Sequence, residues 1–473
     1  MEILDLLPDG AIPLHGLLTT VGLLVYVIGS HALGQRRHPS AAIAWVMAIL
    51  LLPELGVPLY LMFGTRKLPK AGRRAATPLH KLLPDELAPV SMQRLGAAMA
   101  MPPVCAYQAL AVHQDGRQAR EALFRLVESA RERLDVCTFI LGRDAFGDAL
   151  LDALAARARQ GVQVRLLVDG VGTLMGGRRD FSGVRQAGVQ VTHFVPPLRS
   201  PLQWPLRGRT NLRNHRKIVV ADASQLWSGG RNLAGEYFEG SDGGNAWLDL
   251  SFDAQGALAS QAAAIFDADW NFARRPDRAW VDLGARHAWP APGSGRPVAQ
   301  LLPSGPDYAD DTVHTALLTA CYQARQRILI VTPYLVPDEN LLSALALAAR
   351  RGVQVDFVVP ERSNHRLADI ARQRPMRDLA RAGARLWLAA PMMHAKAVIV
   401  DERMAFVGSV NLDGRSLFLN YELMTVFYDQ ADIARFAHWC ESVRQAARLH
   451  QPHEPSLLRF VGEGLVLWLA FQL

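Results

Sequence analysis

Two apolar stretches open the chain. Residues 11–33 contain no Asp, Glu, Lys or Arg and are numerous enough to span a bilayer, and a second apolar stretch covers residues 41–63. The pair predicts an N-terminal transmembrane helical hairpin. Pro53, Glu54 and Pro58 interrupt the second stretch, so one span followed by a re-entrant or interfacial helix is the alternative.

Basic residues flank these stretches unequally. The link between them holds Arg36 and Arg37, whereas a longer run without a carboxylate follows the second stretch: Arg66, Lys67, Lys70, Arg73, Arg74 and Lys81. Because Lys and Arg collect on the cytoplasmic side of a membrane, we expect both termini and the main body in the cytoplasm.

The remaining pattern occurs twice. A helix, an apolar strand, a helix with an Ala/Leu stripe, a glycine and a β-branched strand follow one another up to residue 164, and again up to residue 355. Such alternation is typical of α/β layers around a buried sheet, and its repetition indicates a duplicated domain. The expected limits are 1–68 for the membrane anchor, 69–105 for a proline-rich linker, 106–290 and 295–450 for the two domains, and 451–473 for an apolar C-terminal tail.

The tail is too short for a further span, and Gly462, Glu463 and Gly464 interrupt it. We expect it to dock onto the body or onto the membrane surface.

Composition supports attachment to a membrane. The 473 residues are 50% hydrophobic, the mean hydropathy is +0.07, and the formal charge is +7. A second basic cluster fits anionic lipid or phosphate partners: Arg199, Arg207, Arg209, Arg213, Arg216 and Lys217. The four cysteines lack metal-site spacing, so we expect reduced core residues without disulfides.

One short motif occurs once in each repeat. It reads His, any residue, Lys, four residues and Asp, followed by a Gly and an Asn: His215, Lys217, Asp222, Gly229 and Asn232 in the first copy, and His394, Lys396, Asp401, Gly408 and Asn411 in the second. Residues two apart in a strand share a face, so each His and Lys should point the same way.

Two such sets at a pseudo-twofold interface would form a compact phosphate site. The lysines supply charge and the asparagines supply hydrogen-bond donors. One imidazole can attack phosphorus while the other protonates the leaving alkoxide, and this displacement needs no metal or cofactor. A single His-x-Lys in a strand is more often surface decoration, and the duplication reverses that expectation.

The duplicated motif resembles the signature of the phospholipase D superfamily. More narrowly, the chain is similar to membrane-anchored bacterial cardiolipin synthases, on the motifs at residues 36–39, 44–45, 211–217, 304–307 and 408–413 and over nearly its whole length. The resemblance implies two duplicated phospholipase D-like α/β sandwich domains that form one pseudo-twofold unit behind the N-terminal hairpin. It also implies the bacterial inner membrane as the location.

The family resemblance assigns roles to the matching residues. His215 and His394 would be the nucleophile and the general acid/base, and Lys217, Lys396, Asn232 and Asn411 would hold the phosphate. Asp222 and Asp401 are motif members that are mainly structural in the superfamily. Asp249 and Glu422 occupy the places of the carboxylates that orient the imidazoles, and Ser409 supports the second motif. Gly230 stands where the general motif has serine, as in the cardiolipin branch.

We therefore expect a phosphatidyltransferase that condenses two phosphatidylglycerols into cardiolipin and releases glycerol through a phosphohistidine intermediate. Its partners would be anionic phospholipids and the membrane. A hydrolytic phospholipase D, with water as acceptor, is the first alternative. A nucleic-acid phosphodiesterase is a weaker one, since it would need no anchor and should carry aromatics along a basic groove. A non-catalytic lipid-binding scaffold would not keep both motifs intact.

Overall fold

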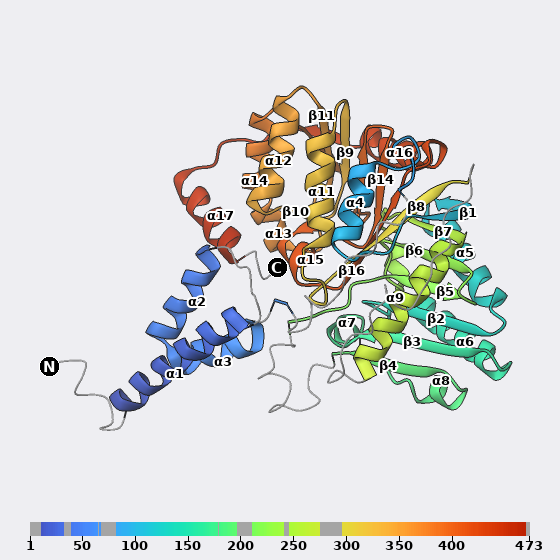
Figure 1. The fold of residues 1–473 in the computed structure, drawn as a ribbon, viewed down its shortest axis with the longest axis horizontal. Helices are drawn as coiled ribbons and strands as arrows, with labels where there is room; N and C mark the ends of the chain where they lie inside the picture. The colour runs from blue at the N-terminus through green and yellow to red at the C-terminus, as the bar shows by residue number, and fades with distance from the viewer. Residues whose placement is uncertain are drawn as a thin grey trace.

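Each repeat forms one half of the molecule (Figure 1). The computed structural model describes residues 11–32, 39–64, 66–67, 82–177, 179–195, 211–240, 246–274 and 296–469. The first half contains strands β1 (Cys105–His113), β2 (Arg133–Thr138), β3 (Gln163–Asp169), β4 (Gln190–Phe194), β5 (Ile218–Ala221), β6 (Gln225–Gly229) and β7 (Ser251–Gly256), with helices α5 (Gly116–Ser129), α6 (Ala145–Arg159), α7 (Gly170–Met175), α8 (Ser182–Gln186) and α9 (Ala257–Arg274).

The second half repeats this order. Its strands are β8 (Val298–Ser304), β9 (Arg327–Val331), β10 (Leu335–Val336), β11 (Gln354–Pro360), β12 (Arg385–Ala389), β13 (Ala397–Val400), β14 (Met404–Gly408), β15 (Leu412–Asp413), β16 (Glu422–Phe427) and β17 (Arg448–His450). Its helices are α11 (Thr312–Gln323), α12 (Glu339–Arg350), α13 (Arg366–Ala371), α14 (Gln373–Arg381), α15 (Gly414–Phe418) and α16 (Gln430–Ala446). The predicted sequence of elements is therefore present twice, as α5–β2–α6–β3 and as α11–β9–α12–β11.

Matching local signals produce the matching elements. Asp144 caps the start of α6 by accepting the N–H of Gly147 at 2.8 Å, and Asp338 caps α12 by accepting that of Asn340 at 3.0 Å. Gly161 and Gly352 follow these helices with φ of +89° and +88°, which only glycine adopts without strain.

A single sheet of 15 strands joins the halves, in the order β17-β12-β11-β9-β13-β14-β16-β8-β1-β7-β6-β5-β2-β3-β4. The halves meet where β1 and β8 pair antiparallel, through Cys105 opposite Ala299 and Ala106 opposite Val298. On either side of that seam the strands follow in corresponding order, from β7-β6-β5-β2-β3-β4 to β16-β14-β13-β9-β11-β12. The predicted duplicated α/β unit is confirmed.

Helices cover both faces of the sheet. Helices α9 and α16 pack on one face, and one apolar core shared by the halves lies there, including Phe252, Phe266, Leu329 and Phe436. Helices α5 and α6 cover the other face of the first half, and α11, α12 and α14 that of the second, each over a separate core. Cys105, Cys137, Cys321 and Cys440 are free and buried, as expected.

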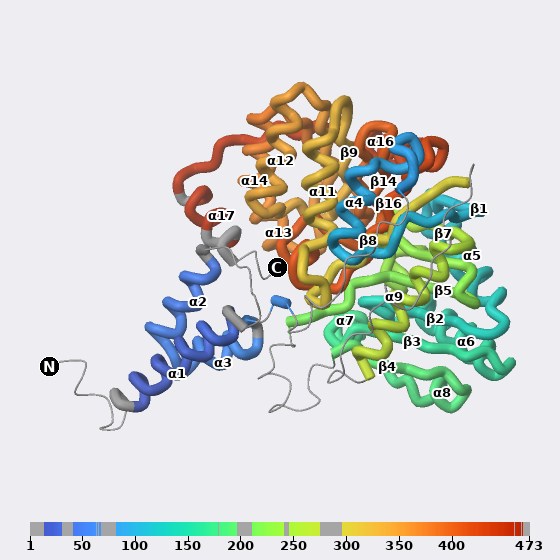
Figure 2. Tube along the Cα trace, in the orientation of Figure 1, coloured from blue at the N-terminus to red at the C-terminus, as the bar shows by residue number. Residues whose placement is uncertain are grey.

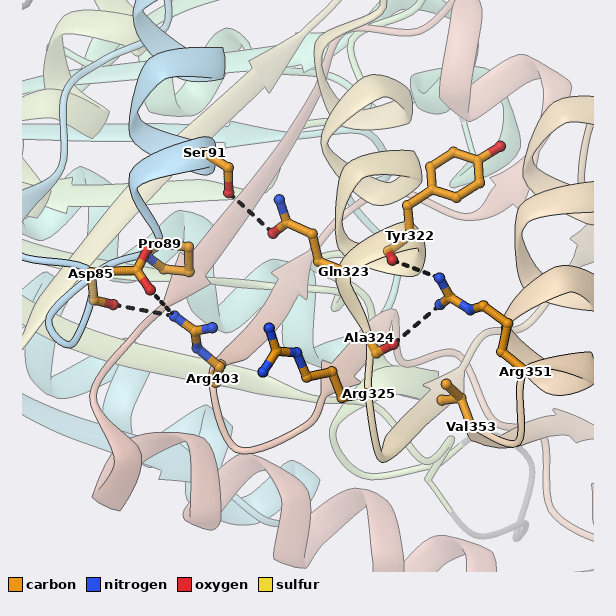
Figure 3. Close-up of a pocket in the computed structure, with 10 residues that line it drawn as sticks. All are labelled: Asp85, Pro89, Ser91, Tyr322, Gln323, Ala324, Arg325, Arg351, Val353 and Arg403. Atoms are coloured by element: carbon orange, nitrogen blue, oxygen red, sulfur yellow. Dashed lines mark hydrogen bonds and ion pairs between the residues drawn. The ribbon is translucent and has the colours of Figure 1, made fainter.

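Part of the segment expected to be a linker is ordered on the second half. Helix α4 (Val90–Ala98) buries Met92 in the core under α11. Two polar contacts hold the start of this helix against the second half (Figure 3): Ser91 donates to Gln323 at 3.1 Å, and Arg403 donates to Asp85 at 2.6 Å. The domain limits drawn from the sequence remain predictions.

The N-terminal apolar stretches form three helices, α1 (Ala11–Ala32), α2 (Pro39–Leu51) and α3 (Pro53–Phe63). The second stretch is divided into two helices at one of the interruptions noted in the sequence. Pro53 lacks an N–H and disfavours helical geometry at Leu52, whose φ is −141°, so α2 ends there and α3 begins. A Cβ at Gly56 would lie 2.6 Å from the carbonyl oxygen of Ala48, so this glycine lets α3 lie against α2.

Among the described residues, no helix combines the length and the apolar character needed to cross a membrane. Helices α1 to α3 lie beside the sheet halves at the left of Figure 2. The described part of the tail forms α17 (Leu457–Leu469), which docks on the body. There the buried Glu463 pairs with Arg377, and Val466 packs against Val336 and Ala371.

Candidate active site

The two His-x-Lys motifs lie immediately before β5 and β13, the buried strands next to β2 and β9. His215, Lys217, His394 and Lys396 are all buried. Lys217 donates to the carbonyl oxygen of its own His215 at 2.7 Å, and Lys396 donates to that of His394. Each His and Lys of a motif therefore lie close together, as the spacing predicts.

The two halves exchange carboxylates. Nδ1 of His215, from the first half, lies 2.9 Å from Glu422 of the second half. Nδ1 of His394, from the second half, lies 2.7 Å from Asp249 of the first. Both carboxylates are fully buried, and each fixes the tautomer of the imidazole it contacts. The other ring nitrogen of His394, Nε2, lies 2.9 Å from Nζ of Lys396. Neither half holds a complete pair.

Backbone contacts across the interface position these pairs. The N–H of His215 donates to the carbonyl of Tyr421 at 2.8 Å, directly before Glu422. The N–H of His394 donates to the carbonyl of Leu248 at 2.6 Å, directly before Asp249. Each histidine therefore arrives on a segment that is hydrogen-bonded to the one carrying its carboxylate.

The two pairs differ in their support. Ser409 donates to Glu422 at 2.5 Å. The corresponding residue of the first half is Gly230, and a Cβ there would lie 2.2 Å from Oδ1 of Asp249. The absence of a side chain at Gly230 thus makes room for the carboxylate that holds His394.

Burial and like charge shape the electrostatics of the site. Burial lowers the pKa of Lys217 to about 7 and that of Lys396 to about 8. Burial and the neighbouring charge of Lys396 lower the pKa of His394 to about 3. Burial also lowers the pKa of His215. Lys396 also acts on His215 and Lys217 on His394, so the four side chains share one site.

The carboxylates stay ionised despite their burial. Burial raises the pKa of Glu422, but His215 and Lys217 outweigh it and leave that pKa below its ordinary value. For Asp249, His394 and Lys396 outweigh burial in the same way. Each carboxylate can therefore stabilise a positive charge on its imidazole.

The motif asparagines are also buried. Asn232 donates to the hydroxyl of Tyr237 at 2.8 Å. The side-chain oxygens of Asn232 and Asn411 have no hydrogen-bond partner among the described residues. Buried amides with unused capacity are candidates for binding a polar ligand.

Aromatic rings around the histidines were not predicted from the sequence. Phe139 lies with its ring centroid 5.1 Å from that of His215, and Tyr237 and Trp247 lie 5.0 and 5.9 Å from His394. Trp247 stands two residues before Asp249 in the sequence. This short separation was the one feature from which a ring near His394 could have been predicted. The rings help to exclude water from the imidazoles.

Asp222 and Asp401 have no contact with the imidazoles. Asp222 accepts the backbone N–H groups of residues 131–133 at 2.8 to 2.9 Å, and Asp401 those of residues 325–327 at 2.8 to 3.0 Å. Both have positive φ, of +52° and +50°. Each therefore fastens the turn after its motif strand to the start of the neighbouring antiparallel strand, β2 or β9.

The described members of the second basic cluster, Arg213, Arg216 and Lys217, are buried. Arg213 is buried and hydrogen-bonds to Asp169. Arg216 points to the opposite side from its neighbours in the motif, where it pairs with Asp269 at 2.6 Å and donates to the carbonyls of Glu422 and Ser304. Arg199, Arg207 and Arg209 lie outside the described residues.

Within the described part of the chain, no group of three or more His, Cys, Asp or Glu side chains could hold a metal ion. A cavity of about 590 Å³ lies away from the histidines, where Arg325, Arg351 and Arg403 surround the contact with helix α4 (Figure 3). The arginines Arg351 and Arg403 are already bound there, to carbonyls at the end of α11 and to Asp85.

Comparison with known proteins identifies the family. Residues 123–270 and 317–444 match the family described as "Cardiolipin synthase, PLD-like domain". The chain belongs to this phospholipase D-like family. Residues 19–64 match a second family, described as "Phospholipase_D-nuclease N-terminal".

Relatives match over most of the chain. Cardiolipin synthase A of Pseudomonas putida (strain W619) is 34% identical over 432 residues, which cover 87% of this chain and 88% of the relative. Cardiolipin synthase A of Serratia proteamaculans (strain 568) is 32% identical over 86% of this chain and 87% of its own. Phosphatidylserine synthase of Haemophilus influenzae Rd KW20 shares the fold, with a TM-score of 0.60 at 15% identity over 81% of this chain and all of the other.

The glycine at position 230 should be essential to the geometry of this phospholipase D-like site. We expect Gly230→Ser to displace Asp249 and to lower kcat about 10- to 100-fold, because a displacement of about 1 Å in a catalytic group costs that much. Ser409→Gly is the matched control: it removes one hydrogen bond from Glu422 without a clash and should cost less than about tenfold. Steady-state kinetics and thermal unfolding of both variants test this. Wild-type kcat in Gly230→Ser would contradict it.

The lysine pKa values predict the alkaline limb of the pH profile. The charged lysines bind phosphate, and kcat/KM reports ionisation of the free enzyme, so kcat/KM should fall about tenfold or more between about pH 7 and about pH 9. A phosphodiester keeps its single charge over this range. Lys217→Arg should move the limb to higher pH, because a guanidinium stays charged. A wild-type kcat/KM that is flat to about pH 9 would exclude this origin.

Proposed function

We propose that the protein is a phosphatidyltransferase that condenses two phosphatidylglycerols into cardiolipin and releases glycerol. The observation that carries the proposal is the pair of exchanged contacts, His215 with Glu422 and His394 with Asp249, beside two buried lysines. Relatives at 34% and 32% identity over most of the chain bear the name cardiolipin synthase A.

The first step transfers a phosphatidyl group to the enzyme. Nε2 of one histidine attacks the phosphorus of the first phosphatidylglycerol, and the bond from phosphorus to the glycerol head group breaks. The other histidine donates a proton to the departing alkoxide, so glycerol leaves neutral and a phosphohistidine remains. The carboxylate on Nδ1 of each ring stabilises the positive charge that the ring carries during the reaction.

The second step regenerates the enzyme. The head-group hydroxyl of a second phosphatidylglycerol gives its proton to the histidine that acted as acid and attacks the phosphorus. The bond from phosphorus to histidine breaks, cardiolipin forms, and both rings return to their starting state.

Four further side chains would hold the phosphate. Lys217 and Lys396 offer charge to its non-bridging oxygens, and binding an anion raises their pKa again. Asn232 and Asn411 have buried amide oxygens without partners, and rotation of either amide would direct its NH2 group to the ligand. Their burial favours transfer to a hydroxyl over reaction with bulk water.

The N-terminal helices would hold the body at the cytoplasmic face of the bacterial inner membrane. On their uncharged sequence, residues 11–33 would cross the bilayer. Helices α2 and α3, broken at Leu52, would complete a hairpin or enter the bilayer as a re-entrant pair. The apolar sequence of these helices and the basic residues after Phe63 support this placement.

Product analysis tests the reaction. With labelled phosphatidylglycerol in mixed micelles containing EDTA, we expect cardiolipin and glycerol in equal amounts. His215→Ala and His394→Ala should each lower turnover about 10³-fold or more while the protein stays folded, because the displacement needs both imidazoles. His438→Ala, on the exposed side of α16, is the matched control and should keep full activity.

Other products would identify the alternatives. Phosphatidic acid in place of cardiolipin would show a hydrolase with water as acceptor. Activity above a few per cent in either histidine variant would contradict the two-histidine mechanism, and loss of activity with EDTA that a divalent ion restores would show a metal requirement.

Topology reporters test the anchor. In the hairpin arrangement, a reporter fused after Arg74 should be cytoplasmic and one inserted at Gln35 should be periplasmic, because the second apolar stretch then crosses the membrane between them. Both reporters on the same face would contradict the hairpin and favour the re-entrant arrangement, in which α2 and α3 enter and leave the membrane on one side.

A further inference from the structure

Exposed apolar side chains gather on three helices of the body. They belong to α7 of the first half, to α13 of the second half and to the tail helix α17, and their exposed fractions range from 48% to 78%: Leu174, Met175, Leu367, Leu457, Phe460 and Val461. We call these six side chains the apolar face. Four of the six lie on α13 and α17, which contact each other, and the other two lie on α7 of the first half. Single exposed apolar residues are ordinary, whereas several large ones on neighbouring helices indicate an interaction surface.

The apolar face lies at the edge of the sheet that carries the active site. Helix α7 begins at the residue after β3 ends, and the last residue of β3, Asp169, accepts the N–H of Asn214, next to His215, at 2.9 Å. In the second half α13 packs on β10, which pairs with β15 directly after Asn411. Both helices therefore flank the ends of the strands at which the histidines lie.

The tail helix turns its apolar side away from the body. At about 100° per residue, Leu457, Phe460 and Val461 fall on one side of α17, and Glu463 and Val466 fall on the other. Glu463 and Val466 make the contacts with the body described above. The docked helix therefore presents three large apolar side chains outward, with exposed fractions of 78%, 49% and 53%.

This side of the molecule is also the side of the N-terminal helices. In Figures 1 and 2, α17 and α13 lie on the left of the second half and α7 on the left of the first half, and α1 to α3 lie further left. A bilayer that holds α1 to α3 would therefore lie on the side of the molecule where α17 is found.

Exposed arginines lie on or next to two helices of the apolar face: Arg362 and Arg366 at the start of α13, and Arg459 on α17. Arg459 also pairs with Glu463 at 3.1 Å, and the exposed Glu361 and Glu454 nearby pair with Arg448 and Arg381. The carboxylate on α13, Asp369, is already engaged by Arg372 at 3.1 Å and by the N–H of Ser363 at 2.9 Å. Apolar side chains with a basic rim match the interface of an anionic bilayer, where the rim meets head groups and the apolar groups enter the acyl boundary.

We propose that the apolar face inserts into the interfacial layer of an anionic bilayer and forms a second membrane contact, separate from α1 to α3. This contact directs the edge of the sheet that carries the histidines toward the lipid surface. The importance of this contact for catalysis rests on the proposed function. If the protein acts on phospholipids, the contact would let a lipid substrate enter the site without leaving the membrane. A second copy of the chain and a protein partner are the competing occupants.

Site-specific labelling of the full-length protein tests the contact. The four native cysteines are buried, so a single introduced cysteine can be labelled with an environment-sensitive dye. We would place it at Leu457→Cys, at Leu174→Cys, and at Gln160→Cys as the matched control. Gln160 follows α6 and precedes β3, which places it at the opposite edge of the sheet.

In vesicles of phosphatidylglycerol and phosphatidylethanolamine, dyes at 457 and 174 should shift to shorter wavelength. Lipids that carry a nitroxide near the head group should quench them several-fold more than the dye at 160. Equal quenching at the three positions would overturn the proposal. A wavelength shift without quenching by lipid would also overturn it, in favour of a protein occupant. The quenching measurement does not depend on activity. The membrane contact can therefore be refuted while the proposed reaction stands, and the proposed reaction can be refuted while the membrane contact stands.

A charge variant tests the effect on substrate access. Leu367→Glu with Phe460→Glu should lower the rate on vesicles about tenfold and change the rate on a soluble short-chain phosphatidylglycerol less than about twofold. Leu347→Glu is the matched control: it is an exposed leucine in the last turn of α12, toward the opposite edge of the sheet, and should change neither rate. Equal losses on both substrates, or no loss on vesicles, would overturn the proposal.

Discussion

The exchange of buried carboxylates between the halves is the constraint on which the rest of the site depends. Glu422 and Asp249 are fully buried, and a buried carboxylate without a partner costs several kcal/mol. The partner of each is the histidine of the opposite half. The continuous sheet and the buried Arg216, which joins Asp269 to carbonyls of the second half, hold the two halves in the register that this exchange requires.

The two halves are alike in fold and unequal in chemistry. In the second half, the hydroxyl of Ser409 donates a hydrogen bond to Glu422. In the first half, the corresponding position is Gly230, and the carboxylate of Asp249 occupies the space where a side chain at that position would lie. The contacts of the lysines also differ between the halves, because Lys396 lies 2.8 and 2.9 Å from the two ring nitrogens of His394, whereas Lys217 donates to the carbonyl oxygen of His215. A two-step displacement needs one neutral and one protonated imidazole, and an unequal pair can adopt that state more readily than an identical one.

Local patterns in the sequence predicted the duplicated fold and the members of the site. The repeated order of elements and the spacing of His215 and His394 depend only on neighbouring residues. The pairing of each histidine with the carboxylate of the other half depends on the seam of β1 with β8, which no local pattern specifies. Arg213 and Arg216 were grouped with a basic cluster that fits anionic partners, and their burial and their pairing with Asp169 and Asp269 could not be read from the sequence. The break at Leu52 was signalled by Pro53, and the rings of Phe139 and Tyr237 had no signal.

Charge and apolar surface occupy the same edge of the sheet for a physical reason. Parallel strands bring their carboxyl ends to one edge, so the residues that follow β3 and β11 meet there in both halves. A phospholipid combines a phosphate with acyl chains. An enzyme that takes it from a bilayer must therefore bind the phosphate close to the surface that contacts the acyl chains. The buried lysines satisfy the first requirement, and the exposed side chains of α7 and α13, a few residues further along the chain, satisfy the second. One topological feature of the duplicated fold thus accounts for the position of both.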